Sequence, residues 1–142
     1  MSYFSNFERL FMQRTLEIVD DYKGDYDTTL LLNCLLGLLL VPNEKFLDVL
    51  PDIPIEHFGN WGLDVNCIST LGKGVNSADM NLKMLVRRLR NSVAHCRIEP
   101  VPNDHRPCEG FSFRDTNGFE ATIGAIELKT FVTCLLAYLL SR

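Results

Sequence analysis

Apolar residues recur at intervals of three and four positions along several segments of this 142-residue chain, and such a periodicity predicts amphipathic helices. Three stripes of this kind predict helices over residues 5–22, residues 78 to about 95, with Ser77 as the N-cap, and residues 127–140. A further helix is predicted over residues 27–41, and because it is apolar on nearly all sides we expect it at the centre of the fold. The stripes are Phe7, Leu10, Phe11, Ile18 and Val19; Leu82, Leu85, Val86, Leu89 and Val93; and Leu128, Phe131, Val132, Leu135 and Leu139.

The segments between these helices predict little further regular structure. A short helix is expected over residues 44–50, and prolines and glycines mark residues 51–76 as a long loop. Alternating apolar residues over 111–123, interrupted by Asn117-Gly118, predict one β-hairpin. The sequence therefore predicts an all-α fold, a bundle of four or five helices with a small appended hairpin, as a single domain over residues 1–142.

Composition limits the classes of function. Hydrophobic residues make up 46% of the chain, enough to fill one core, while the formal charge of −4 argues against a protein that binds polyanions over its whole surface. The longest apolar run, Leu30 to Val41, is too short for a membrane span of about 20 residues, so no membrane contact is expected. Five cysteines without a C-x-x-C pair indicate reduced thiols and a cytoplasmic protein.

One segment concentrates positive charge. Residues 83–97 hold five of the 14 basic residues of the chain and no acidic residue. A phosphate backbone would dock on such a local patch, although an ordinary solvated helix face explains the same residues. The predicted RNA-binding residues are Lys83, Arg87, Arg88 and Arg97, and Arg90 is the fifth basic residue of the segment.

Within this segment, Arg90-Asn91-Ser92-Val93-Ala94-His95 reads R-N-x-x-x-H near the end of a predicted helix. The string resembles the R-x(4–6)-H motif of the HEPN superfamily, small helical domains of prokaryotic toxin and anti-phage defence systems. The resemblance implies a HEPN-like fold and a metal-independent endoribonuclease that works as a homodimer without a cofactor. It also implies RNA as substrate, and an antitoxin or other regulatory protein as a partner.

The resemblance implies catalytic roles for three residues. His95 would act as general acid or base, Arg90 would bind two phosphate oxygens, and Asn91 would orient His95 or contact phosphate. The reaction is attack of the RNA 2′-OH on the adjacent phosphorus, which gives a cyclic phosphate and leaves DNA uncleaved. Arg90 and His95 lie about 140° apart on an ideal helix, so two motif helices paired across a two-fold axis would bring them into one groove.

Other interpretations of the same residues stay open. A histidine at a helix C-terminus suits the helix dipole without any catalysis. The chain can also be a HEPN-like module that binds RNA or a nucleotide, or another partner, without cleaving it. A zinc-binding regulator that uses His95, His105 and Cys108 is the weakest alternative, because the spacing matches no common zinc pattern.

Overall fold

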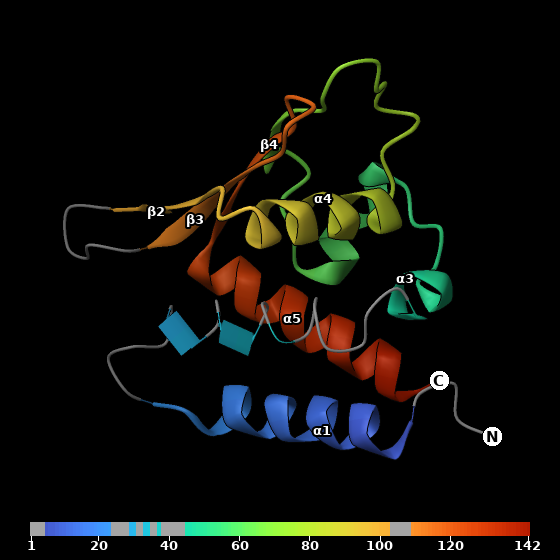
Figure 1. Cartoon of the computed structure of the whole chain (residues 1–142), viewed down its shortest axis with the longest axis vertical. Helices are drawn as coiled ribbons and strands as arrows, with labels where there is room; N and C mark the ends of the chain where they lie inside the picture. The colour runs from blue at the N-terminus through green and yellow to red at the C-terminus, as the bar shows by residue number, and fades with distance from the viewer. Residues whose placement is uncertain (1–4, 24–28, 31–32, 35–36, 38–44, 103–108) are drawn as a thin grey trace.

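Helices and a four-stranded antiparallel sheet make up the computed structural model, which describes residues 5–23, 29–30, 33–34, 37, 45–102 and 109–142 (Figure 1). In chain order its elements are α1 (Asn6–Asp21), α3 (Lys45–Val49), the 3₁₀ helix η1 (Ile55–Trp61), β1 (Ile68–Thr70), α4 (Leu82–Ala94), β2 (Ile98–Val101), β3 (Gly110–Arg114), β4 (Glu120–Gly124) and α5 (Ala125–Leu140).

The sheet corrects the fold class expected from the sequence. The all-α prediction with one minor hairpin is wrong, because the strands form a single sheet in the order β1-β4-β3-β2 and the fold is mixed α/β. The predicted hairpin is confirmed as β3 and β4, with Phe111 opposite Ile123 and Phe113 opposite Ala121. The strands β1 and β2 extend this hairpin on both sides into a sheet.

Both missed strands are short edge strands with weak local patterns. Strand β2 contains Pro100, which lacks an N–H and is tolerated in a sheet only at an edge. Strand β1 has three residues and an irregular register against β4. The segment 51–76, expected to be an irregular loop, contains both η1 and β1. Pairing with distant residues, rather than local propensity, makes these segments strands.

The helices follow their local sequence signals more closely. Helix α1 begins with a capping box, in which the Ser5 side chain accepts from the backbone N–H of Glu8 and the Glu8 carboxylate accepts from the N–H of Ser5. Helix α4 begins later than predicted, because Asn81 rather than Ser77 is its N-cap and accepts from the N–H of Met84. Of the predicted helix 27–41, residues 29–30, 33–34 and 37 are helical and the rest lie outside the described residues.

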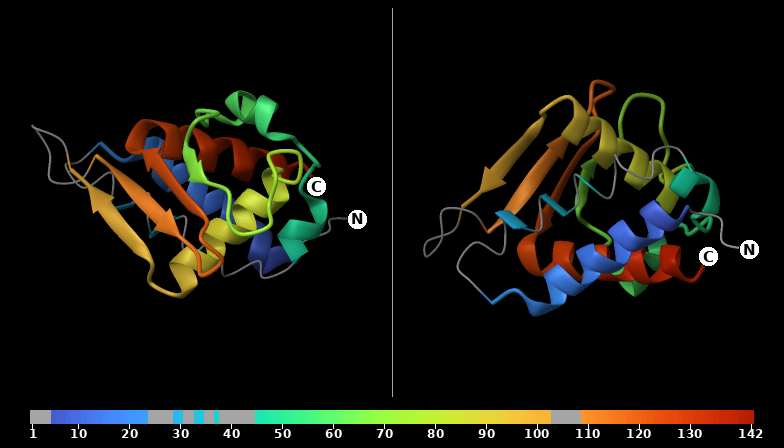
Figure 2. Two further views of the ribbon diagram at one scale, coloured as in Figure 1. Left: turned by 90° about the horizontal axis from the view of Figure 1, so that it is seen from above. Right: turned by 60° about the horizontal axis from the view of Figure 1, so that its bottom comes forward.

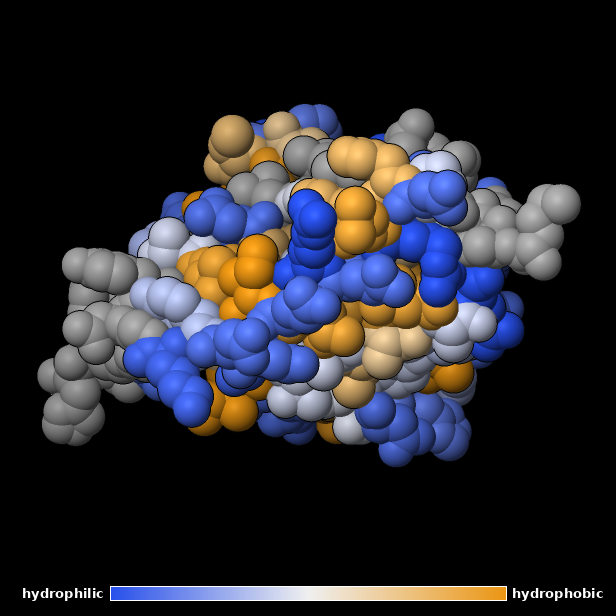
Figure 3. Space-filling model, turned by 90° about the horizontal axis from the view of Figure 1, so that it is seen from below, coloured by the Kyte–Doolittle hydropathy of each residue, from blue (hydrophilic) through white to orange (hydrophobic). Residues whose placement is uncertain are grey.

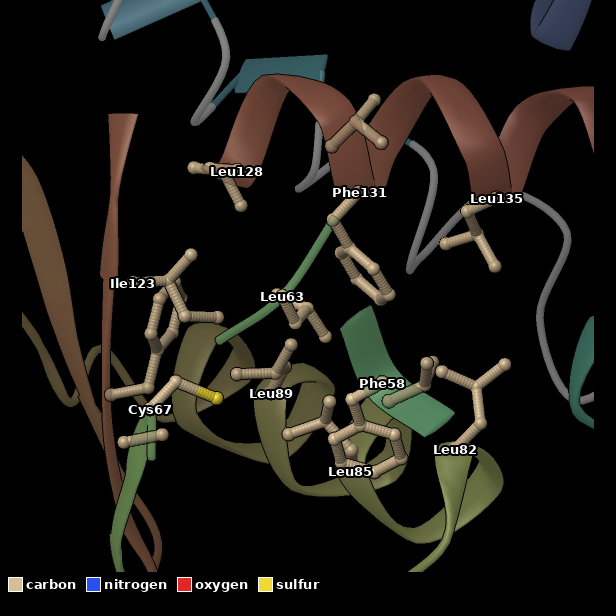
Figure 4. Packing of buried hydrophobic residues seen from close by; sticks show 14 of the residues in the cluster. Phe58, Leu63, Cys67, Leu82, Leu85, Leu89, Ile123, Leu128, Phe131 and Leu135 are labelled. Atoms are coloured by element: carbon tan, nitrogen blue, oxygen red, sulfur yellow. The ribbon is translucent and has the colours of Figure 1, made fainter. Parts of the chain in front are cut away.

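The core lies between the sheet and the helices. Helix α5 runs between α1 and α4 in Figure 1, and α4 and α5 both pack against the sheet. Two views from other directions show the strands at one end of the helical part (Figure 2). Phe58 of η1 and Leu63 are buried between α5 and α4, among Phe131, Leu85 and Leu89 (Figure 4). Helix α4, which carries the basic segment, packs directly against β3, and Phe58 and Leu63 fill the space between α4 and α5.

Helix α1 covers the far side of α5 and leaves apolar residues on the surface. Phe7, Leu10 and Ile18 are exposed on this helix, and Figure 3 shows the corresponding face with apolar and polar residues interspersed. Among the helices in the described part of the chain, none combines the length and the apolar character that a bilayer crossing requires.

The cap of α4 makes a prediction about stability. Replacing Asn81 by Ala removes the acceptor for the N–H of Met84 and the bond from Asn81 Nδ2 to Asp52, so we expect a loss of about 1 kcal/mol in the free energy of unfolding. Ser77→Ala is the matched control and should change the stability by less than about 0.5 kcal/mol. Urea unfolding measures both. A larger effect of Ser77→Ala would contradict the cap assignment.

Candidate functional site

The end of α4 is closed by a Schellman motif that positions His95. His95 is the C-cap, Cys96 adopts a left-handed conformation with φ of 56°, and the chain then turns into β2. The N–H of Arg97 donates to the Ser92 carbonyl at 2.7 Å and the N–H of Cys96 donates to the Val93 carbonyl at 3.1 Å. The His95 side chain is exposed at this end of the helix.

The basic residues of α4 lie on two different sides of the helix. Lys83, Arg87, Arg90 and Ala94 follow one another at intervals of four, three and four, within an arc of roughly 60°. Arg87 is exposed and Lys83 and Arg90 are partly exposed, so this side faces away from the core. We name Lys83, Arg87 and Arg90 the cationic stripe. Its C-terminal end approaches the exposed segment His95–Arg97.

The other side of α4 is bonded to a buried carboxylate. Asp115, whose side chain is only 2% exposed, accepts from Arg88 Nη1 at 3.0 Å and from Asn91 Nδ2 at 3.2 Å. The backbone N–H of Thr116 donates to the second oxygen of the same carboxylate at 2.7 Å. Arg88 and Asn91 are three positions apart, so they project from the same side of the helix toward this carboxylate.

The hairpin turn carries Asp115 to α4. The N–H of Gly118 donates to the Asp115 carbonyl and the N–H of Asp115 donates to the Phe119 carbonyl, which closes a tight turn with Gly118 at a φ of 94°. A second loop rests on this turn, because the N–H of Lys73 donates to the Asn117 carbonyl at 2.8 Å. The turn thus has a fixed geometry, and it holds the carboxylate against the helix.

The environment of Asp115 keeps its carboxylate charged. Burial by itself raises the pKa of Asp115. The hydrogen bonds from Asn91, the Thr116 backbone and Arg88, together with the positive charge of Arg88, outweigh that effect and hold the pKa below its ordinary value. The carboxylate is therefore an anion at neutral pH, and it neutralises one of the cations of α4.

The sequence-predicted site residues thus fall into two groups. Arg90 lies near the C-terminal end of α4 and His95 caps that end, while Lys83 and Arg87 lie further toward the N-terminus on the side of Arg90, and Arg97 follows the cap. Arg88 and Asn91 are instead bound to Asp115, a residue inside the predicted hairpin to which the sequence analysis gave no role. The sequence did carry a signal for this contact, because Asp115 directly follows the alternating apolar residues of β3. An aspartate buried at such a position needs a cationic partner.

The described residues give little support to the alternative of a zinc-binding regulator. Within them, no group of three histidines, cysteines or acidic residues is arranged to hold a metal ion. His105 and Cys108 lie outside the described residues. Cys96 is exposed beside His95, whereas Cys67 is buried, and burial together with the nearby charge of Asp64 raises the pKa of the Cys67 thiol to about 11.

The buried ion pair predicts a pH-dependent stability. Because the folded pKa of Asp115 is lowered, its stabilising contribution is complete above the ordinary aspartate pKa of about 3.9 and is lost as the pH falls through the folded value. Asp115→Asn should cost about 1–3 kcal/mol at pH 7, since it leaves Arg88 without its charged partner. Urea unfolding of both proteins between about pH 7 and pH 3 should show the difference shrinking in acid.

The exposed Asp79→Asn provides the control, with a change of no more than about 0.5 kcal/mol at either pH. A difference between the parent protein and Asp115→Asn that stays constant down to the lowest pH would contradict a charged, paired Asp115.

Comparison with known proteins tests the resemblance drawn from the R-N-x-x-x-H string. No curated protein and no solved structure matches the chain. A family model described as HEPN pEK499 p136 matches it over residues 1–142. The match covers the motif helix, the sheet and all the elements described above, and it confirms the HEPN resemblance at the level of the family. With its cationic stripe and exposed His95 at the end of α4, this chain belongs to the HEPN family pEK499 p136.

Proposed function

We propose that this protein is a metal-independent endoribonuclease whose chemistry is carried by Arg90 and His95. The observation that carries the proposal is the exposure of His95 at the end of α4, five residues after Arg90, in a chain of a HEPN family. An imidazole can accept or donate a proton and a guanidinium can bind two phosphate oxygens, so the pair offers proton transfer and phosphate binding at one helix end.

The reaction that suits these groups is an internal transfer at phosphorus. The 2′-OH loses its proton to a base as its oxygen bonds to phosphorus, and the bond from phosphorus to the 5′-oxygen breaks. The leaving oxygen takes up a proton, which gives a 2′,3′-cyclic phosphate and a 5′-OH. A histidine serves as acceptor or donor of the proton, and a guanidinium stabilises the added negative charge on the phosphoryl oxygens.

In the proposed homodimer, the partner subunit supplies a second histidine and a second arginine to the site. The reaction needs one proton acceptor and one donor, whereas among the described residues of each chain His95 is the one histidine at this end of α4. Arg90 and His95 are also about 140° apart on an ideal helix. Two α4 helices paired across a two-fold axis would bring two histidines and two arginines to one phosphate, so we include this pairing in the proposal.

The cationic stripe gives the RNA strand a path to this site. Lys83 and Arg87 precede Arg90 on the same side of α4, and the exposed Arg97 follows the cap. In a chain of net charge −4, such a local patch accounts for docking of a polyanion. We assign Arg88 and Asn91 a supporting role, because Asp115 already binds both. We also propose that the enzyme acts in the cytoplasm and is regulated by a protein partner, as a toxin or defence effector would be.

Removal of either proposed catalytic group tests the function. We expect purified protein to cleave labelled RNA in EDTA, to leave cyclic-phosphate ends and to spare the matching DNA. His95→Ala and Arg90→Ala should each lower the cleavage rate at least about 100-fold, because general acid–base catalysis typically contributes 10²–10⁴-fold. Circular dichroism checks that the variants keep their fold.

His57→Ala is the matched control, since His57 is an exposed histidine on η1, and it should keep full activity. An equimolar mixture of the His95→Ala and Arg90→Ala proteins should regain part of the activity if the site is shared between subunits. If the parent protein binds RNA but never cleaves it, the proposal of an enzyme is wrong and the alternative of a HEPN-like binding module is supported.

The proposed RNA path predicts a change in salt dependence. Arg87→Ala should weaken RNA binding at low salt and reduce the slope of log affinity against log salt by about 1, as loss of one phosphate contact does. Fluorescence anisotropy at several salt concentrations measures the slope. Arg14→Ala removes an exposed arginine from α1, on the other side of α5, and should leave the slope unchanged (Figure 1). Equal effects of both variants would argue against a local path.

A further inference from the structure

The last turn of α4 is attached to the hairpin at two successive residues. Before Asp115, the N–H of Arg114 donates to the carbonyl of Arg97 at 3.0 Å, just after the cap. Asp115 itself binds the side chains of Arg88 and Asn91, just before the cap. The segment from 92 to 96 that contains His95 therefore spans two attachment points on one rigid turn.

The residues that Asp115 binds are also the ones that support the backbone of this turn. The Asn91 carbonyl accepts the N–H of His95 at 3.0 Å. The Arg88 carbonyl accepts from Ser92 Oγ at 2.9 Å, and the Ser92 carbonyl in turn accepts the N–H of Arg97. One carboxylate is thus connected, through two side chains and their own carbonyl groups, to the backbone at both ends of the cap.

Burial of the charged Asp115 carboxylate costs free energy that a contact with a purely structural role would not require. Asp115 is buried, and a desolvated anion is stable only when charge and hydrogen bonds compensate it. A well-packed apolar residue at the turn would be no less stable, whereas the charged group fixes the direction of an amide and a guanidinium. A fixed direction is useful where a neighbouring group must meet a reacting atom within a fraction of an ångström.

We propose that Asp115 is a positioning residue for the RNA-cleaving site, which holds Asn91 and Arg88 and thereby fixes the turn of α4 that carries Arg90 and His95. The inference rests on the proposed function for its catalytic part. Asp115 touches neither substrate nor reacting atoms. Its effect reaches the reaction through the orientation of the two catalytic side chains.

Asp115→Asn tests the inference, because it keeps the size of the side chain and removes its charge. At a temperature where the variant is fully folded, we expect kcat for RNA cleavage to fall about 10–100-fold with KM within about 3-fold, as a misplaced catalytic group would give. Asp52→Asn is the matched control. Asp52 bonds to Asn81 at the opposite end of the same helix, and its variant should keep kcat within about 2-fold.

An exchange of the two partners separates positioning from stability. In the double variant Asn91→Asp with Asp115→Asn, an amide at 115 can donate to a carboxylate at 91, and Arg88 keeps an anionic neighbour. We expect this double variant to recover most of the kcat lost in Asp115→Asn. Failure to recover kcat in a folded double variant, or a loss confined to KM, would overturn the positioning role.

Hydrogen exchange provides a readout that does not depend on RNA cleavage. In Asp115→Asn the backbone amides of His95, Cys96 and Arg97 should exchange faster than in the parent, while Asp52→Asn should leave them protected. If the parent protein cleaves no RNA, the proposed function fails, yet faster exchange still supports Asp115 as the group that fixes this turn. Unchanged exchange in Asp115→Asn would overturn the inference in either case.

Discussion

The arrangement of α4 depends on one buried carboxylate. Asp115 brings a negative charge from the β3–β4 turn into contact with a helix that is otherwise basic, and it binds Arg88 and Asn91 there. Without this anion, the guanidinium of Arg88 would lie partly buried and uncompensated against the sheet. The interaction links the two halves of the molecule, since the hairpin belongs to the sheet and α4 belongs to the helical core.

This carboxylate also divides the basic segment into two parts. Arg88 is bound to Asp115, and Lys83, Arg87 and Arg90 lie on the outward side of the helix. A surface that binds a phosphate backbone requires solvent-accessible cations. On α4 such cations lie on the outward side of the helix, away from Asp115. The same geometry separates the residues that we propose to bind RNA from Arg88 and Asn91, which are bound to Asp115.

The Schellman motif explains how His95 is presented. A helix that continued past residue 94 would place the histidine along its side, whereas the left-handed Cys96 ends the helix and leaves the imidazole at its exposed tip. The R-N-x-x-x-H string ends at this tip, in a chain that belongs to a HEPN family. Strand β2 then begins within three residues, which places the tip beside the edge of the sheet.

Local signals in the sequence determined the helices α1, α4 and α5 and the β3–β4 hairpin, because apolar periodicity and turn residues act over a few positions. The R-N-x-x-x-H string is likewise readable from the sequence alone, because it is a short motif. The tertiary structure decided the mixed α/β fold, since Pro100 and the three residues of β1 become strands only by pairing with segments distant in sequence. It also decided the roles of Arg88, which the sequence analysis assigned to RNA binding, and of Asn91, to which the HEPN resemblance gave a catalytic role. Their partner, Asp115, lies 24 positions or more along the chain, and only folding brings a carboxylate from that distance to the helix.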